Sequence, residues 1–293
     1  FWRKYVNLIV LIAIISLFFW LAGSIMGVIR PSGTITYEWD ETRRAVNYYN
    51  FYYAPTGQLA DTLIYGIQRN CGIFTEGTMF AFQLVIAFMM EMRSSNGRPF
   101  VKIILVATLY TTFSTTGIIA TVLYYGIRLF FSESNSKFSK ICKALFLPFI
   151  VVIGSIALLN LALTKMTTGS YGVRYDHIVT CFKTFIDTFP IGLGYGGSEV
   201  LQSYYHYKQG SSVGIPLLFA YGGLGGALLI ILPTFLYVYY SVKEKKWEGL
   251  AYTVTFTLIC FFTSVMTGYA LPWAVTAFVY MKGSYEMKKS EPD

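Results

Sequence analysis

The chain has 293 residues, 55% of them hydrophobic and only 13% charged, with a mean hydropathy of +0.52. A soluble domain carries about a quarter charged residues, so this composition excludes an ordinary soluble protein and predicts an integral membrane protein. The net charge of +8 does not indicate nucleic-acid binding, because the Lys and Arg residues gather at the ends of apolar runs, where membrane topology explains them.

Apolar stretches predict the membrane spans: Val6–Ile29, Phe74–Met90, Phe100–Phe131, Ala144–Leu163, Val213–Tyr240 and Leu250–Tyr280. The third and the last are interrupted by "TTFSTTG" and "TGYALP", and each has basic residues at both ends. Since positive ends belong on the cytoplasmic side, each interrupted stretch must enter and return as a hairpin of two short helices. The prediction is an all-α, polytopic transmembrane bundle of about eight crossings, with both ends cytoplasmic.

No internal repeat stands out, so residues 1–293 are predicted to form a single membrane domain. The chain begins with Phe1 directly before a span, and we therefore expect further spans upstream. Two long segments, at about 30–72 and 164–212, are predicted to lie outside the membrane as loops rich in Tyr and Gly. Functional residues of a membrane bundle tend to lie on such loops.

Two charged residues, Arg69 and Glu76, flank the outer end of the second span in "RNCGIFTEG". Charges at such places often serve only as interfacial anchors. Glu76 lies about three residues inside the apolar run that begins at Ile73, where a carboxylate needs a partner, a water-filled space or a proton. Alternatively, a glutamate in the first turn simply stabilises the N-terminus of the helix.

The second outer segment contains an amphipathic stretch, Arg174–Thr188, that we predict to be a helix lying on the outer surface. It carries Arg174, Asp176 and His177 at its start. Apolar residues repeat at helical spacing and are predicted to pack on the bundle or on lipid rather than to form a ligand cage: Ile178, Phe182, Phe185 and Phe189.

The glycine-rich "GLGYGG" (Gly192–Gly197) matches G-x-G-x-x-G in form only, because no predicted strand precedes it. We predict a tight turn that ends the surface helix. The alternative is a turn whose backbone N–H groups approach a ligand, with Gly194 and Tyr195 lining the substrate.

Several other chemistries are excluded. The sequence has no P-loop, HExxH or GxSxG motif, its cysteines lack metal-ligand spacing, and its two histidines are too few for a His-rich metal site. Outward arginines, a carboxylate at a helix end and tyrosine-rich loops beside a bilayer instead suit a lipid diphosphate that carries a glycan.

Four stretches, in this order, resemble motifs of the O-antigen polymerase and ligase superfamily: "RNCGIFTEGTMFAFQL", "LYTTFSTTGIIATVL", "VRYDHIVTCFKTFIDTFPIGLGYGG" and "SSVGIPLLFAYGGLGGALL". The resemblance implies a GT-C-like, metal- and cofactor-independent glycosyltransferase. Such enzymes take a glycan from undecaprenyl diphosphate on the outer side of the bacterial cytoplasmic membrane and pass it to an acceptor hydroxyl. Arg69 and Arg174 would hold the donor diphosphate, and Glu76 would orient Arg69 or the acceptor.

One departure from the family pattern favours a polymerase over a ligase. Ligases place His-Asn at the start of the closing span, whereas this chain has Ser211 and Ser212 there, with His206 out of register. We therefore expect polymerisation of O-antigen, capsule or exopolysaccharide repeats, with Ser211 and Ser212 lining the substrate. The general base stays open among four residues: Glu76, Asp176, His177 and His206.

Three alternatives remain open: an O-antigen ligase of the same superfamily, a lipid-linked oligosaccharide flippase or transporter, and a non-catalytic scaffold. Broken helices also occur in transporters, although the sequence shows neither inward charges across its midplane nor internal repeats. The expected partners of the enzyme are the bilayer, the undecaprenyl-diphosphate-linked glycan, a chain-length regulator and a flippase, with no nucleic acid.

Overall fold

The computed structural model describes these residues: 2–37, 40–56, 67–74, 76–94, 97–131, 169–206, 212–263 and 272–277. They are mostly helical, which confirms the prediction at that level. The chain divides into two compact units, Phe1–Thr121 and Val122–Asp293, and each is described by itself. The predicted span Ala144–Leu163 and nearly all of "TGYALP" lie outside the described residues.

Within the described residues, two helical stretches are long and apolar enough to cross a membrane: Trp2–Ile25 and Ile215–Lys243. Shorter apolar helices cover Pro99–Thr111, Thr115–Phe131 and Trp247–Phe261. These lengths and compositions support a membrane protein, while the number of crossings and the GT-C-like architecture stay predictions.

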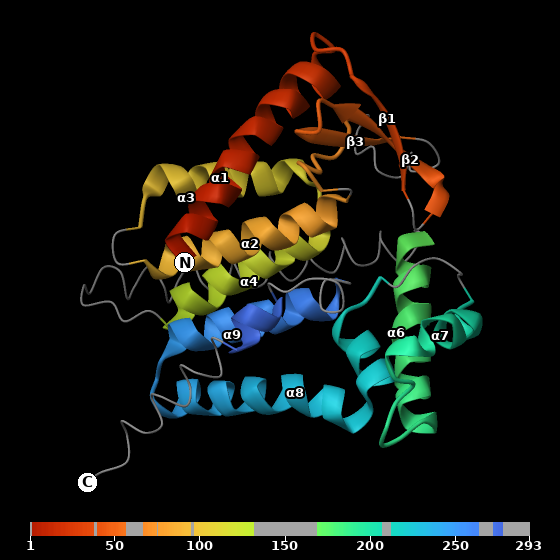
Figure 1. Cartoon of the computed structure of the whole chain (residues 1–293). Helices are drawn as coiled ribbons and strands as arrows, with labels where there is room; N and C mark the ends of the chain where they lie inside the picture. Colours follow the sequence, from red (N-terminus) through yellow and green to blue (C-terminus); the bar gives the residue numbers. More distant parts are fainter. Residues whose placement is uncertain are drawn as a thin grey trace. The chain divides into compact units, whose positions relative to one another are not determined.

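The first unit is built around α2 (Gly77–Arg93), which packs against α1 (Trp2–Phe19) and α3 (Pro99–Thr111). A π-helical turn, η1 (Trp20–Ile25), extends α1, and Figure 1 shows α1 inclined to α2 and α3. Most side chains of α2 are buried. This follows from its sequence, because a helix that is apolar all round has no face suited to water.

The polar interruption "TTFSTTG" separates α3 from α4 (Thr115–Phe131), as predicted. Thr112 and Ser114 are buried and satisfy the backbone of the break: the Thr112 hydroxyl donates to the Leu109 carbonyl at 2.7 Å, and Ser114 Oγ accepts the Gly117 N–H at 3.3 Å. Gly117 lies so close to Leu109 that a Cβ there would approach it within 2.9 Å, so the first turn of α4 folds back on the last turn of α3. The break is thus enclosed in protein.

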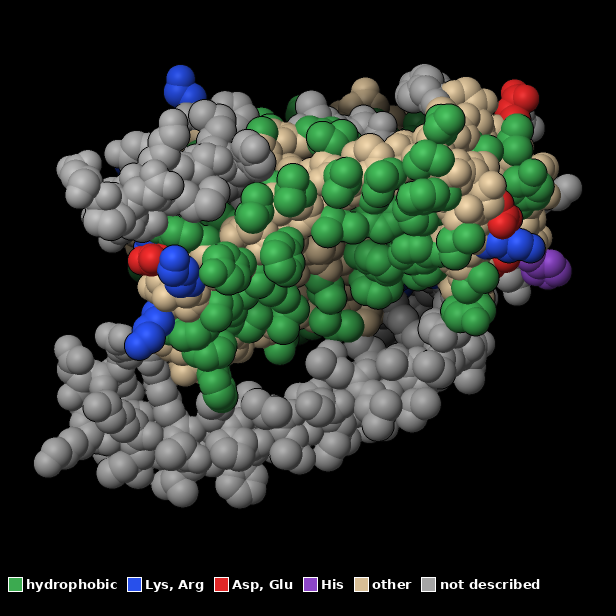
Figure 2. Space-filling view, turned by 90° about the horizontal axis from the view of Figure 1, so that it is seen from below, with side chains coloured by type: hydrophobic (Ala, Val, Ile, Leu, Met, Phe, Trp, Pro, Cys, Tyr) green, Lys and Arg blue, Asp and Glu red, His purple; other side chains and the backbone are tan. Residues whose placement is uncertain are grey.

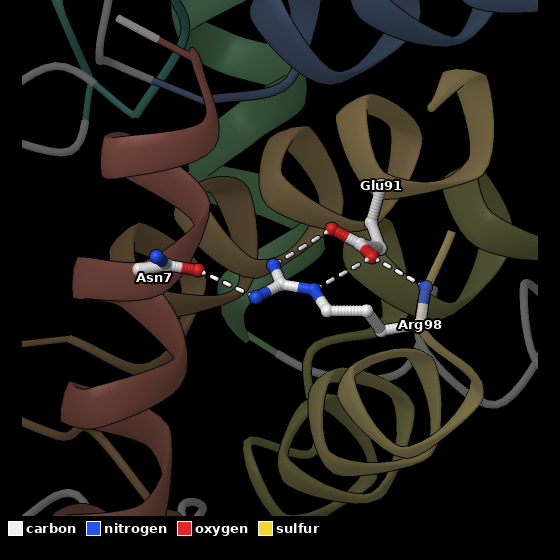
Figure 3. Close-up of polar contacts among 3 residues, drawn as sticks. All are labelled: Asn7, Glu91 and Arg98. Carbon is white, nitrogen blue, oxygen red and sulfur yellow. Dashed lines mark hydrogen bonds and ion pairs between the residues drawn. The ribbon is translucent and has the colours of Figure 1, made fainter. Parts of the chain in front are cut away.

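An ion pair joins the end of α2 to the start of α3 (Figure 3). The guanidinium of Arg98 donates to both carboxylate oxygens of Glu91, from Nε at 3.1 Å and from Nη2 at 3.0 Å. Its Nη1 donates to Asn7 Oδ1 of α1 at 2.8 Å, and the Arg98 backbone N–H donates to Glu91 at 2.7 Å. One arginine therefore holds three helices together at the end that we predict to be cytoplasmic.

A three-stranded antiparallel sheet occupies part of the segment that was predicted to be a loop, so the all-α prediction was wrong there. Its strands are β1 (Gly33–Tyr37), β2 (Asp40–Tyr48) and β3 (Tyr52–Thr56), in the order β1-β2-β3. The reason is visible in "TITY" and "YYA", which are rich in β-branched and aromatic residues.

The turn between β2 and β3 depends on asparagine. Tyr49 and Asn50 both have positive φ, 55° and 62°, which asparagine tolerates better than most residues. Asn47 and Asn50 fix the turn because Asn47 Nδ2 donates to Asn50 Oδ1 and the Asn50 N–H donates to Asn47 Oδ1, both at 2.8 Å. One side of the sheet is packed: Tyr48, Tyr52 and Ala54 are buried against Phe19, Trp20, Ile29 and Val46.

The second unit contains α6 (Gly169–Asp187), α7 (Ser198–Tyr204), α8 (Ile215–Lys243) and α9 (Trp247–Phe261). Here α8 and α9 lie side by side, and α6 runs across the first turns of α8 (Figure 1). The aromatic stripe of α6 packs as predicted, with Phe182 and Phe185 each within 6 Å of the Phe219 ring of α8: 5.8 Å and 5.7 Å between centroids. The helix begins earlier than the predicted Arg174.

The outward side of α8 is hydrophobic along much of its length. Its exposed apolar side chains include Leu224, Leu228, Leu232, Phe235 and Tyr239. Figure 2 shows such side chains gathered in the middle of the view, with charged side chains at the two ends. A hydrophobic band between charged ends is the pattern expected of a helix surrounded by lipid.

Candidate functional site

The segment that carries Arg69 has little regular structure, yet its backbone is held at almost every residue. Trp20 Nε1 donates to the Gln68 carbonyl at 2.7 Å, and the Tyr52 hydroxyl donates to the Arg69 carbonyl at 3.5 Å. The N–H of Tyr53 donates to the Gly72 carbonyl at 2.9 Å. Arg69, with a half-buried side chain, therefore stands on a fixed loop rather than on a mobile one.

The centre of this segment is Asn70, a residue that our sequence reasoning missed. Asn70 is fully buried, and its Nδ2 donates to Ser16 of α1 at 3.2 Å and to Thr111 of α3 at 3.0 Å. Its Oδ1 accepts the Gly72 N–H at 3.0 Å, while its own N–H donates to the Thr111 carbonyl at 2.9 Å. Its side chain and its N–H are engaged, so Asn70 holds the backbone next to Arg69 in place.

Glu76 precedes α2 instead of lying inside an apolar helix, which corrects our sequence-based placement. It is the N-cap residue, and its carbonyl accepts the N–H groups of Met79 and Phe80 at 3.1 and 3.2 Å. Its carboxylate accepts from the Thr78 hydroxyl at 3.1 Å and is half-buried. A negative charge here stabilises the N-terminus of α2, as the more modest interpretation predicted.

Arg69 and Glu76 both act on Cys71, a free and fully buried thiol between them in sequence. The pKa of the Cys71 thiol is raised to about 12, mainly by burial and also by the charge of Glu76, while the charge of Arg69 lowers it. Both charged groups therefore lie close enough to the Cys71 thiol to affect its pKa.

In the second unit, His177 is enclosed at the start of α6. It has no exposed surface, and its ring lies 4.1 Å from that of Tyr205. The Ser212 N–H donates to His177 Nδ1 at 3.1 Å, and Ser212 Oγ lies 2.9 Å from the same nitrogen. Because a backbone N–H can only donate, Nδ1 must accept, so the ring is neutral and carries its proton on Nε2.

Other predicted residues gather around His177. Asp176 Oδ2 accepts the backbone N–H of His206 at 2.9 Å, and His206 is exposed. Arg174 is half-buried and lies one turn earlier on the same helix. Ser211 and the side chain of Tyr195 lie outside the described residues.

The glycine-rich turn has a structural partner that the sequence did not reveal. Helix α8 is broken at Gly223, whose φ of 53° and ψ of −142° are not helical. The N–H groups of Leu193 and Gly194 donate to the α8 carbonyls of Ala220 and Tyr221, both at 2.9 Å. In return, the Leu224 N–H of α8 donates to the Pro190 carbonyl at 2.8 Å.

The turn therefore caps the backbone groups that the break leaves without helical partners. This confirms the prediction of a tight turn after the surface helix. The N–H of Gly194 donates to the Tyr221 carbonyl, so it is not a donor to a ligand. The space beside Gly194 is open, and its role in lining the substrate stays a prediction.

The structure thus forms two clusters of predicted residues, one in each unit. The first contains Arg69 and Glu76, and the second contains Arg174, Asp176, His177, His206 and Ser212. Among the described residues, no group of three or more His, Cys, Asp or Glu side chains is placed to hold a metal ion. Comparison of the chain with family models, curated proteins and solved structures finds no match.

Proposed function

We propose that this protein is a polysaccharide polymerase of the bacterial cytoplasmic membrane. It joins oligosaccharide repeat units carried on undecaprenyl diphosphate, on the outer side of the membrane, as the motif resemblance implies. The observation that carries the proposal is the fixed Arg69 segment. The buried amide of Asn70 holds this irregular loop in one conformation through its hydrogen bonds. Such a fixed loop suits an arginine that must bind an anion in one geometry.

In the proposed reaction, the acceptor hydroxyl attacks the anomeric carbon of the donor glycan. A new glycosidic C–O bond forms as the bond from that carbon to the diphosphate oxygen breaks, and undecaprenyl diphosphate leaves. Arg69 and Arg174 stabilise the charge that develops on the diphosphate. The acceptor proton passes to a general base.

The geometry narrows the choice of base. His177 is fully buried, and its Nδ1 already accepts from Ser212, which favours a positioning role over that of the base. The adjacent Asp176 and His206 remain candidates, with His206 the more exposed, and Glu76 remains the candidate from the first unit.

The test uses arginine variants with matched controls. Arg69→Ala and Arg174→Ala should each lower repeat-unit polymerisation by about 100-fold or more, as expected when a charge-stabilising donor is removed. Arg44→Ala in the sheet and Lys183→Ala on α6 remove exposed positive charges from the same segments and should leave the glycan ladder normal. Normal ladders in both arginine variants, with the protein present in the membrane, would reject the proposal.

A flippase is the second candidate, favoured by the break in α8 at Gly223, since broken helices occur in transporters. Purified protein in liposomes separates the two functions. A polymerase elongates the lipid-linked glycan, whereas a flippase moves it between leaflets without forming a glycosidic bond.

A further inference from the structure

We infer that the β2–β3 hairpin is anchored in the membrane–water interface by an aromatic tip composed of Phe18, Phe19, Tyr49 and Phe51. This inference rests on the membrane location in the proposed function but not on the glycosyl-transfer reaction. Its partner is the lipid headgroup region beside α1.

Ring contacts join the hairpin to the end of α1. The Phe51 ring stacks on Phe19 at 6.2 Å with an interplanar angle of 15°, and the Tyr49 ring lies 6.3 Å from Phe19. Phe18 meets Phe19 edge to face at 5.4 Å. Although they contact one another, Phe18, Tyr49 and Phe51 remain 59%, 54% and 52% exposed. Water would be a poor surrounding for so much clustered aromatic surface.

The apolar surface continues along α1 and η1. Large exposed side chains recur every three or four residues, at Leu8, Leu11, Ile14, Phe18, Leu21 and Ile25. This spacing places them along one stripe of the helix. Because Trp2–Ile25 is long and apolar enough to cross a bilayer, lipid is the partner that fits the stripe, and the aromatic tip lies in its outer part.

The hairpin itself is amphipathic in the way that interfacial segments are. Its amides bond to each other, Asn47 with Asn50, and the Tyr53 hydroxyl donates to Asn50 Oδ1 at 3.1 Å. Polar groups of the turn therefore form hydrogen bonds with one another, while the rings of Tyr49 and Phe51 are exposed. Tyrosine favours a site where one end meets lipid and the other meets water.

A sugar-binding tip is the rival explanation, and it also uses exposed aromatic rings. The pairing of Asn47 with Asn50 argues against it, because the oxygens of both amides already accept hydrogen bonds within the turn and only amide N–H groups are left for sugar hydroxyls. Direct continuity with the α1 stripe favours lipid.

The experiment measures depth with nitroxide labels on the full chain in liposomes of phosphatidylethanolamine and phosphatidylglycerol. Single cysteines replace Tyr49 or Phe51 after Cys142→Ser, with Leu11→Cys as the lipid control and the exposed Thr36→Cys of β1 as the aqueous control. We expect labels at 49 and 51 to collide severalfold more with oxygen, relative to a water-soluble nickel chelate, than the label at 36.

Three results would overturn the inference: collision with the nickel chelate at 49 and 51 as frequent as at 36, protection from both reagents, or immobilisation only when soluble repeat-unit glycan is added. The last would assign the tip to sugar. Since no result depends on polymerisation, failure here leaves the glycosyltransferase proposal to its own test.

Discussion

At the scale of single residues, the buried amide of Asn70 is the most constrained polar group around the proposed donor site. It bridges α1, the end of α3 and the Gly72 backbone through four hydrogen bonds. A buried donor or acceptor that loses its partner costs free energy, because it cannot turn to water instead. The position of Arg69 therefore depends on the buried side chain that follows it in sequence.

Asn70→Ala should lower the free energy of unfolding by about 1–3 kcal/mol, since it strands the Gly72 N–H in the interior. Thermal unfolding of the purified protein in detergent measures this as a lower midpoint. Asn47→Ala is the matched control, because its amide bonds are exposed and water can replace them. Equal shifts in the two variants would contradict the role assigned to Asn70.

His177 supplies a second prediction at this scale. His177→Asn keeps an acceptor near the position of Nδ1, so it should retain most of the thermal stability and most of the polymer ladder. His177→Leu keeps the bulk but strands the Ser212 N–H, and we expect a loss of roughly 1 kcal/mol or more and shorter glycans. If both variants lost all polymerisation while staying folded, the imidazole itself would be required and His177 would return as a candidate base.

At the scale of elements, the second unit is organised by the contact between the glycine-rich turn and the break in α8. A Cβ on Gly192 would lie 2.5 Å from the Gly223 nitrogen, and one on Gly223 would collide with the Pro190 carbonyl. Both glycines also have positive φ. The turn follows α6, so this close backbone contact, together with the ring contacts of Phe182 and Phe185 with Phe219, helps to fix how α6 lies against α8.

Gly223→Ala should be strongly destabilising, by at least about 1–3 kcal/mol for the backbone conformation alone. Gly225→Ala, two residues away on the same helix, has open space and should be neutral or slightly stabilising, since alanine favours helix. The thermal unfolding midpoints of the two variants give the comparison. A well-folded Gly223→Ala protein with an unchanged midpoint would show that the break does not need glycine.

At the scale of the whole molecule, the proposal requires the two clusters to face the same side of the membrane. The positive ends of the apolar stretches are predicted to lie in the cytoplasm, as are both chain ends. The two segments that carry the clusters are then predicted to lie on the outer side.

Labelling from outside tests this topology. A membrane-impermeant maleimide applied to spheroplasts should modify Thr36→Cys and Glu199→Cys but not Ser94→Cys or Lys243→Cys, all at exposed positions, in a Cys142→Ser background. The native Cys71 should stay silent, because it is buried and its raised pKa, about 12, keeps the thiol protonated at pH 8. If Thr36→Cys or Glu199→Cys reacted only from the cytoplasmic side, the cluster of the same unit would not lie on the outer face, which would contradict the proposal.

How much could be predicted from the sequence differed from feature to feature. The helices α2 and α8, the break at Thr112–Ser114 and the packed stripe of α6 follow from local hydrophobic patterns, which are visible within one segment. The role of Asn70 was not visible, because its partners Ser16 and Thr111 lie 54 and 41 residues away. Sequence also gave no sign of the break in α8, since glycine is common in membrane helices.

The candidate site was anticipated only as a set of residue types. The predicted residues Arg69, Glu76, Arg174, Asp176 and His177 rest on side-chain type and on the motif resemblance, and neither says anything about hydrogen-bond direction. That His177 accepts from Ser212 depends on the path of a backbone N–H, which no residue pattern records.

The polar side chains of α1 and η1 have a consequence for synthesis. Tyr5, Asn7, Ser16 and Trp20 bond to residues made much later: Gln83, Arg98, Asn70 and Gln68. While the ribosome is still making that stretch, the side chains of Tyr5, Asn7 and Trp20 lack these partners in the bilayer, whereas Ser16 can still donate to the Ala13 carbonyl of its own helix. A chain stalled near position 60 would present such groups to lipid, which is a feature that proteases clearing faulty membrane proteins could recognise.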